Sequence, residues 1–180
     1  MRITLGDLEL HPVAISATFA AGTLDLQPTE WTLSGPLTVQ GEATLAGMDI
    51  VLRLRLDGQL AAPCARCLEA MGFDLRRELR LVYQPDSEMG DAPEVEIHTA
   101  DTEIGFFQGD AIELEDVVRE QVLLAAPMRA LCREDCQGIC PQCGLNRNAD
   151  TCTCERAGDA RWEALARLRD LPKSGGSGRS

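Results

Sequence analysis

The chain is poor in residues that most enzymes rely on: of its 180 residues, only His11 and His98 are histidines and 4% are aromatic. Histidine is the usual proton acceptor near neutral pH and a common metal ligand, so its scarcity argues against most hydrolases and metalloenzymes. The sequence also contains no phosphate-binding glycine loop, no nucleophile elbow and no His-Glu-x-x-His zinc motif. Nucleotide-binding, hydrolase and zinc-protease functions therefore find no support.

Long apolar runs are missing as well. No stretch approaches the roughly 18 apolar residues that a membrane-spanning helix needs, and the first residues lack the apolar core of a secretory signal. The sequence therefore predicts a cytoplasmic protein with no membrane partner. In that compartment disulfides are rare, and grouped cysteines more often bind metal.

Charge is unevenly distributed along the chain. The 29 acidic and 17 basic residues give a net charge of −12, and the segment 86–120 holds twelve acids and the single base Arg119. The remainder is nearly neutral, so contact with nucleic acid is excluded only through this segment. The segment is either a solvated acidic surface or a docking surface for a basic partner. The candidate docking residues are Asp91, Glu94, Glu96, Asp101 and Glu103.

The first half of the chain has the pattern of β-strands. Apolar and polar residues alternate in three successive segments, 37–45, 52–60 and 73–83. A period of two over consecutive segments predicts an antiparallel β-meander with one buried face. Arg77 is an exception because it falls on the apolar face. Segments 3–10 and 23–33 are candidates for further strands.

The second half turns helical and then rich in cysteine. Apolar residues at helical spacing from 114 to 125 follow a capping box of Asp110 and Glu113, and Pro127 ends the predicted helix. The expected fold class is α+β: an antiparallel β-meander, as an open sheet or a partial barrel, with a capping helix and a small Cys-rich zinc-binding C-terminal segment. The expected organisation is a β-rich domain with the acidic segment and helix (1–127), a Cys-rich zinc module with a C-terminal helix (128–171) and a disordered tail (172–180).

Eight cysteines carry the strongest chemical signal. In Cys140-Pro-Gln-Cys143-Gly144, a tight turn aims two thiolates at one metal, and the glycine supplies the positive φ that completes the turn. Cys152 and Cys154 follow closely and can supply the other two ligands. Four thiolates around Zn²⁺ form a closed tetrahedral site with no open position for water.

The other four cysteines can form a second site. Cys64 and Cys67 lie between two predicted strands, at a hairpin tip, and Cys132 and Cys136 share a face if their segment is helical. The simplest pairing gives two zinc ions, one bound by these four residues and one by the four that follow. An interleaved pairing stays open because sequence does not fix connectivity. A redox dithiol at Cys64 and Cys67 is disfavoured, because it requires a helix N-terminus in a βαβ setting.

Several motifs together are similar to one bacterial family. They are Cys64-Ala-Arg-Cys67-Leu68-Glu69, residues 112–117 leading to 126–132, residues 136–146, Cys152-Thr-Cys154 and residues 159–162. In this order they resemble the YceD family, the large ribosomal RNA subunit accumulation proteins, over residues 37–171. The resemblance implies a β-rich N-terminal part, a Cys-rich C-terminal segment and a role in accumulating or processing large-subunit (23S) rRNA. It implies no catalytic residue.

The implied partner is large-subunit rRNA or a pre-ribosomal particle. The candidate RNA contacts are Arg66, Arg129, Arg133, Arg147 and Arg156, which lie near the cysteines. A zinc ion with four thiolates carries a net charge of −2, so Arg66, Arg133 and Arg147 are equally explained as compensating charges. Three hypotheses follow: a non-catalytic ribosome biogenesis factor with structural zinc, an adaptor for a basic ribosomal protein and, ranked last, a thiol redox enzyme.

Overall fold

The structure, a computed structural model, describes residues 1–86 and 104–154. It comprises two compact units, Met1–Cys136 and Gln137–Ser180. The segment after residue 127 contacts the first unit, because the N–H of Ala65 donates to the carbonyl of Ala130 at 2.7 Å. No helix among the described residues is long and apolar enough to cross a membrane.

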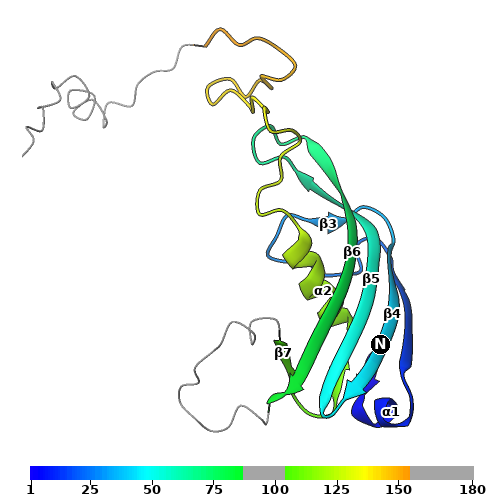
Figure 1. The fold of residues 1–180 in the computed structure, drawn as a ribbon. Coiled ribbons are helices and arrows are strands. Elements are labelled where there is room, and N and C mark those ends of the chain that lie inside the picture. Colours follow the sequence, from blue (N-terminus) through cyan, green and yellow to red (C-terminus); the bar gives the residue numbers. More distant parts are fainter. Residues whose placement is uncertain (87–103, 155–180) are drawn as a thin grey trace, which may run out of the picture. The chain divides into compact units, whose positions relative to one another are not determined.

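A six-stranded sheet forms the framework of the first unit (Figure 1). Its strands are β2 (Val13–Phe19), β3 (Thr32–Leu33), β4 (Leu37–Ala46), β5 (Asp49–Pro63), β6 (Ala70–Pro85) and β7 (Ile104–Phe107). They lie in the order β2-β4-β5-β6-β7, with β3 paired to β5. The predicted meander is confirmed as β4, β5 and β6, which pair antiparallel. The sheet stays open, and among the strands of the described residues only β7 joins it in parallel.

The register of β5 and β6 separates a buried face from a solvated one. Leu54 lies opposite Leu79 on the inner face, and Arg55 lies opposite Glu78 on the outer face, where the two form an ion pair. The predicted helix is confirmed as α2 (Leu114–Ala125), which places Val118 and Val122 in the same hydrophobic core as the inner leucines. Each such buried side chain contributes about 1.5–3 kcal/mol to folding.

The N-terminal segment differs from the expected strand over 3–10. It forms the short strand β1 (Arg2–Thr4) and then helix α1 (Leu5–Leu10). The helix begins there because the Thr4 hydroxyl accepts a hydrogen bond from the N–H of Asp7 at 3.1 Å, which caps the first turn. Segment 23–33 yields only β3, and the strand β2 was not predicted.

The start of α2 also differs from the predicted capping box. The residues before it form strand β8 (Ala111–Glu113), which pairs antiparallel with β1 as a separate two-stranded sheet. Glu113 therefore becomes the N-cap residue itself, without a side-chain capping bond. Asp110 lies before β8 and accepts a hydrogen bond from the Arg2 guanidinium at 2.9 Å.

The exposed edge of β6 explains the exceptional position of Arg77. Among the described residues, β7 pairs with β6 only over Val82–Pro85, so the rest of that edge of β6 has no neighbouring strand. Arg77 lies opposite Leu56, on the inner face, and its side chain is exposed. A charge pointing inward on an edge strand prevents another strand from pairing there, since pairing would bury it.

Candidate metal centres

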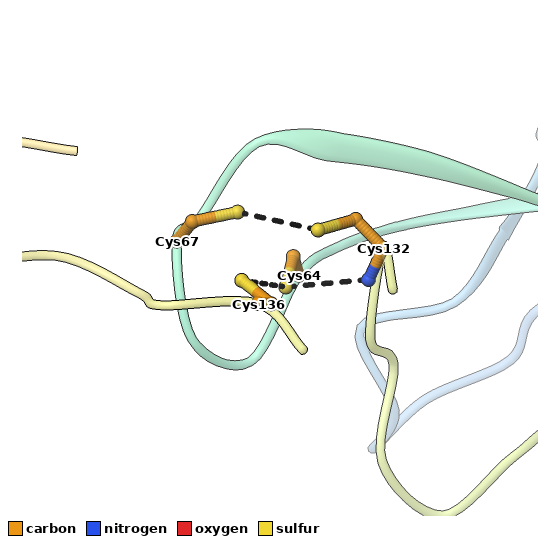
Figure 2. A group of neighbouring side chains, drawn as sticks. All are labelled: Cys64, Cys67, Cys132 and Cys136. Carbon is orange, nitrogen blue, oxygen red and sulfur yellow. Dashed lines mark hydrogen bonds between the residues drawn. The ribbon is translucent and has the colours of Figure 1, made fainter. Parts of the chain in front are cut away.

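The first centre consists of Cys64, Cys67, Cys132 and Cys136, which we call centre 1 (Figure 2). The first two cysteines lie in the tight turn that joins β5 to β6, and the other two follow α2. The stretch between Cys132 and Cys136 is not helical, and a turn closed by the N–H of Cys136 on the carbonyl of Arg133 at 3.2 Å brings the two cysteines together. The four sulfur atoms lie within 4.8 Å of one another.

The sulfur distances of centre 1 fit a bound zinc ion. The Sγ of Cys64 lies 3.9 Å from that of Cys136, and the Sγ of Cys67 lies 3.7 Å from that of Cys132. A tetrahedron with Zn–S bonds of about 2.3 Å places its sulfurs about 3.8 Å apart. A disulfide would require about 2.05 Å, and all four thiols are free. Centre 1 can therefore hold a metal ion.

Backbone N–H groups make the Cys64 sulfur a favourable anionic ligand. The N–H of Cys132 donates to it at 3.4 Å, and together with N–H groups of Cys67 and Arg66 it lowers the pKa of Cys64 to about 6, against the opposing effect of burial. Burial and the neighbouring thiols raise the pKa of Cys132 to about 12. The four thiols therefore do not all ionise on their own, and a divalent cation supplies the charge that allows four thiolates.

Arg66 acts on the backbone of centre 1. Its Nη1 donates to the carbonyl of Glu134 and to the carbonyl of Cys136, both at 2.9 Å. These bonds hold the loop that carries two of the four cysteines against the hairpin turn that carries the other two. Arg66 was predicted as an RNA contact or a compensating charge. In the structure Arg66 has a third role, which is to hold the backbone of residues 134–136 against the hairpin turn. No sequence pattern predicts this role.

The second centre, centre 2, consists of Cys140, Cys143, Cys152 and Cys154. The sulfur of Cys152 lies 3.4 Å from that of Cys140 and 3.5 Å from that of Cys143. Backbone N–H groups of Cys143 and Gln142 lower the pKa of Cys140 to about 6. Hydrogen bonds with the thiols of Cys152 and Cys143 raise the pKa of Cys154 to about 12. The structure thus groups the cysteines as in the simplest predicted pairing.

A short hairpin supports centre 2. Ile139 and Asn146 form an isolated antiparallel bridge, and Gly144 has the positive φ of 73° that the sequence predicts after the second cysteine. The Asn146 side-chain oxygen accepts hydrogen bonds from the N–H and the side-chain amide of Asn148, at 2.9 and 2.8 Å. Centre 2 is therefore fixed by local contacts within a few residues of the chain.

The burial of Cys64 and Cys67 weighs against redox chemistry at this pair. A pKa near 6 is also what a reactive thiol would have, but Cys64 has no exposed surface and Cys67 is 5% exposed. An attacking thiolate must reach its substrate. Cys64 instead lies among three other cysteines, and its sulfur accepts from three backbone N–H groups, which is the environment of a metal ligand.

The remaining predicted contact residues are partly placed. Arg129 and Arg147 are exposed, and the Nε of Arg133 lies 3.4 Å from the carboxylate of Asp135. Arg156 lies outside the described residues. The same holds for all five candidate docking acids, Asp91, Glu94, Glu96, Asp101 and Glu103.

Known proteins and one family model match most of the chain. A family model described as "Large ribosomal RNA subunit accumulation protein YceD" matches residues 52–169, which include all eight cysteines. An uncharacterized protein of Mycobacterium tuberculosis is 32% identical over 116 residues, covering 62% of this chain and 53% of that protein.

Two further relatives come from distant organisms. The uncharacterized protein YlbN of Bacillus subtilis is 25% identical over 113 residues, covering 61% of this chain and 59% of that protein. The chloroplastic "Large ribosomal RNA subunit accumulation protein YCED homolog 1" of Zea mays is 28% identical over 187 residues, covering 86% and 61%. The chain thus spans about half to three fifths of the length of these relatives. No solved structure matches it significantly.

Proposed function

Because the chain belongs to the YceD family of large ribosomal RNA subunit accumulation proteins, we propose that it is a non-catalytic ribosome biogenesis factor that supports the accumulation of 23S rRNA. Its partner is the large-subunit rRNA or a precursor particle, and it acts in the cytoplasm, where these particles assemble. The observation that supports this proposal most is the family match over residues 52–169, which covers most of the β5–β6 hairpin and both centres.

Zinc has a structural task in this proposal. Each centre offers four cysteines, and a closed tetrahedral site leaves zinc no open position for water or substrate. Centre 1 joins the β5–β6 hairpin to the segment after α2, which is distant in sequence. Zinc would therefore hold the hairpin tip and this segment as one rigid surface. Iron can also occupy a site of four thiolates, so metal analysis must use protein from zinc-replete cells.

The experiment is co-sedimentation of the purified protein with large-subunit precursor particles at increasing salt. Contacts between arginine and phosphate release counterions, so the affinity should fall steeply with salt. Charge reversal of the exposed Arg129 and Arg147 should reduce the slope, whereas reversal of Arg2, which is paired with Asp110, serves as the control. Binding that is absent, or independent of salt and of these reversals, would contradict RNA contact.

A second candidate function, an adaptor for a basic ribosomal protein, rests on the surface of α2. Glu115 and Asp116 are exposed there. The guanidinium of Arg119, the only base in the acidic segment, donates to the carbonyls of Asp25 and Gln27. Replacing the two acids by Gln and Asn should abolish a protein contact and leave the affinity for RNA intact. Unchanged protein contacts would eliminate this candidate.

A further inference from the structure

Solvent reaches most of the sulfur ligands of centre 2. Cys143 and Cys154 are exposed and Cys152 is half-buried, whereas Cys140 is buried. In centre 1 the proportion is reversed, because three of its four cysteines are buried. The oxidation of a thiolate by a small reagent depends on how accessible the sulfur is. Centre 2 is therefore the more accessible of the two to an oxidant dissolved in water.

Two accessible sulfurs of centre 2 also lie close together. The Sγ of Cys143 is 3.5 Å from that of Cys152, which follows it by nine residues. A disulfide needs a distance of about 2.05 Å, so the two atoms would have to come closer by about 1.5 Å. Whether they can do so depends on what holds the segment that carries Cys152.

The hydrogen bonds of residues 151–154 are made by sulfur alone. In the part of the chain that the structure describes, the last backbone hydrogen bond runs from the N–H of Asp150 to the carbonyl of Asn146, at 3.1 Å. Beyond it, the Cys152 sulfur contacts the sulfurs of Cys140 and Cys143 and accepts from the N–H of Cys154. A metal ion would therefore fix this segment, and without the ion Cys152 is free to approach Cys143.

Centre 1 is held in a different way. Its exposed thiol, Cys132, has the sulfur of Cys67 at 3.7 Å (Figure 2). The two segments that carry these thiols are joined by hydrogen bonds that need no sulfur. The N–H of Ala65 donates to the carbonyl of Ala130 at 2.7 Å, and Arg66 donates to two further carbonyls. These bonds resist the movement that a disulfide would require.

We propose that Cys143 and Cys152 form an oxidation site for hydrogen peroxide, whose disulfide releases the zinc ion of centre 2 while centre 1 keeps its own. The Cys143 thiolate attacks one peroxide oxygen, so that an S–O bond forms, the O–O bond breaks and hydroxide leaves. The Cys152 thiolate then attacks this sulfur, so that the S–S bond forms and a second hydroxide leaves. The two thiolates give up two electrons, which the peroxide gains.

The zinc ion, left with two of its four thiolates, passes into water. The bond to zinc shares the sulfur electron pair that attacks peroxide, so the reaction needs prolonged exposure. A dithiol reductant with added zinc should reverse it. The inference rests on the structural zinc of the proposed function, and it is independent of the contact with RNA.

The first test exposes full-length, zinc-loaded protein to hydrogen peroxide and follows free zinc with a chromogenic indicator. One of the two ions should be released and the other retained. Cys140→Ser, which keeps only centre 1, should hold its ion under the same conditions. Cys64→Ser, which keeps only centre 2, should release its ion as fast as the unchanged protein releases one. Release of both ions together, or of neither, would overturn the inference.

Peptide mapping of the unchanged protein identifies the bridge without any variant. After peroxide treatment, the remaining thiols are alkylated in denaturant with a chelator, and trypsin separates residues 134–147 from residues 148–156 by cutting after Arg147. A disulfide between Cys143 and Cys152 should link these two peptides. A bridge within centre 1, a bridge through Cys140, or sulfinic acid in place of a bridge would overturn the inference. Fewer than two zinc ions before peroxide is added would instead contradict the proposed role of zinc.

Discussion

Replacing one cysteine in each centre should separate the contributions of the two metal ions. Cys64→Ser removes a thiolate from centre 1 and should lower the zinc content from two ions per chain to one. Centre 1 closes a long loop, because Cys132 follows Cys64 by 68 residues. Closing a loop of that length removes chain entropy worth about 4 kcal/mol from the unfolded state. We expect the first unit to lose stability of that order.

The matched variant is Cys140→Ser in centre 2. Cys152 follows Cys140 by only 12 residues, for which the same relation gives about 3 kcal/mol, and the loss falls on the second unit. The assay is urea unfolding followed by tryptophan fluorescence in a Trp162→Phe background, so that the signal comes from Trp31, which is buried in the first unit. Cys64→Ser should shift this transition and Cys140→Ser should not. Two zinc ions in Cys64→Ser, or identical transitions in both variants, would refute the reasoning.

Three further predictions follow from the sheet and the thiols. Gly41→Ala should lower the free energy of unfolding by about 1–3 kcal/mol or more, because the added Cβ would lie 1.9 Å from the Arg53 carbonyl oxygen. Gly72→Ala is the control: its Cβ would meet no atom closer than 4.0 Å, so it should leave the free energy of unfolding unchanged or raise it. Urea unfolding measures both variants. Arg77→Leu should increase self-association in analytical ultracentrifugation, because it removes the inward charge from the β6 edge; a variant that stays monomeric would contradict this. Zinc should remain bound at neutral pH and be released as the pH falls, because protons compete with the metal for the four thiolates of each centre. Backbone N–H groups that lower the pKa of Cys64 and of Cys140 favour their thiolates in this competition. A chromogenic zinc indicator measures the release, and loss already near neutrality would contradict thiolate ligation.

The sequence predicted those parts of the fold in which one periodicity extends over many residues. Nine to eleven residues of alternation identify β4, β5 and β6, and twelve residues at helical spacing identify α2. Short elements carry too few residues for a period to show, which explains why α1 and β8 were not anticipated. The helix α1 is decided by one capping bond at Thr4, and β8 exists because it pairs with β1.

The candidate sites show a similar division. The spacing of the cysteines predicted that Cys64 with Cys67, and Cys140 with Cys143, each share a metal, since two residues between cysteines form a local turn. The pairing of Cys64 and Cys67 with Cys132 stayed open in the sequence, because that pairing depends on how the chain returns to the hairpin after α2. The hydrogen bonds from Arg66 to two carbonyls and the left-handed backbone at Leu68 could not be predicted, because no sequence pattern signals them. Both features arise from the turn that brings the thiols together.

The most direct measurement of the central claim is the metal content of the chain purified under reducing conditions from zinc-replete cells, combined with its unfolding before and after chelation. The account predicts two zinc ions per chain, eight thiols that a modifying reagent reaches only after chelation, and a lower unfolding midpoint of the first unit once zinc is removed. A metal-free chain that unfolds at the same midpoint, or one whose cysteines are paired as disulfides, would contradict it.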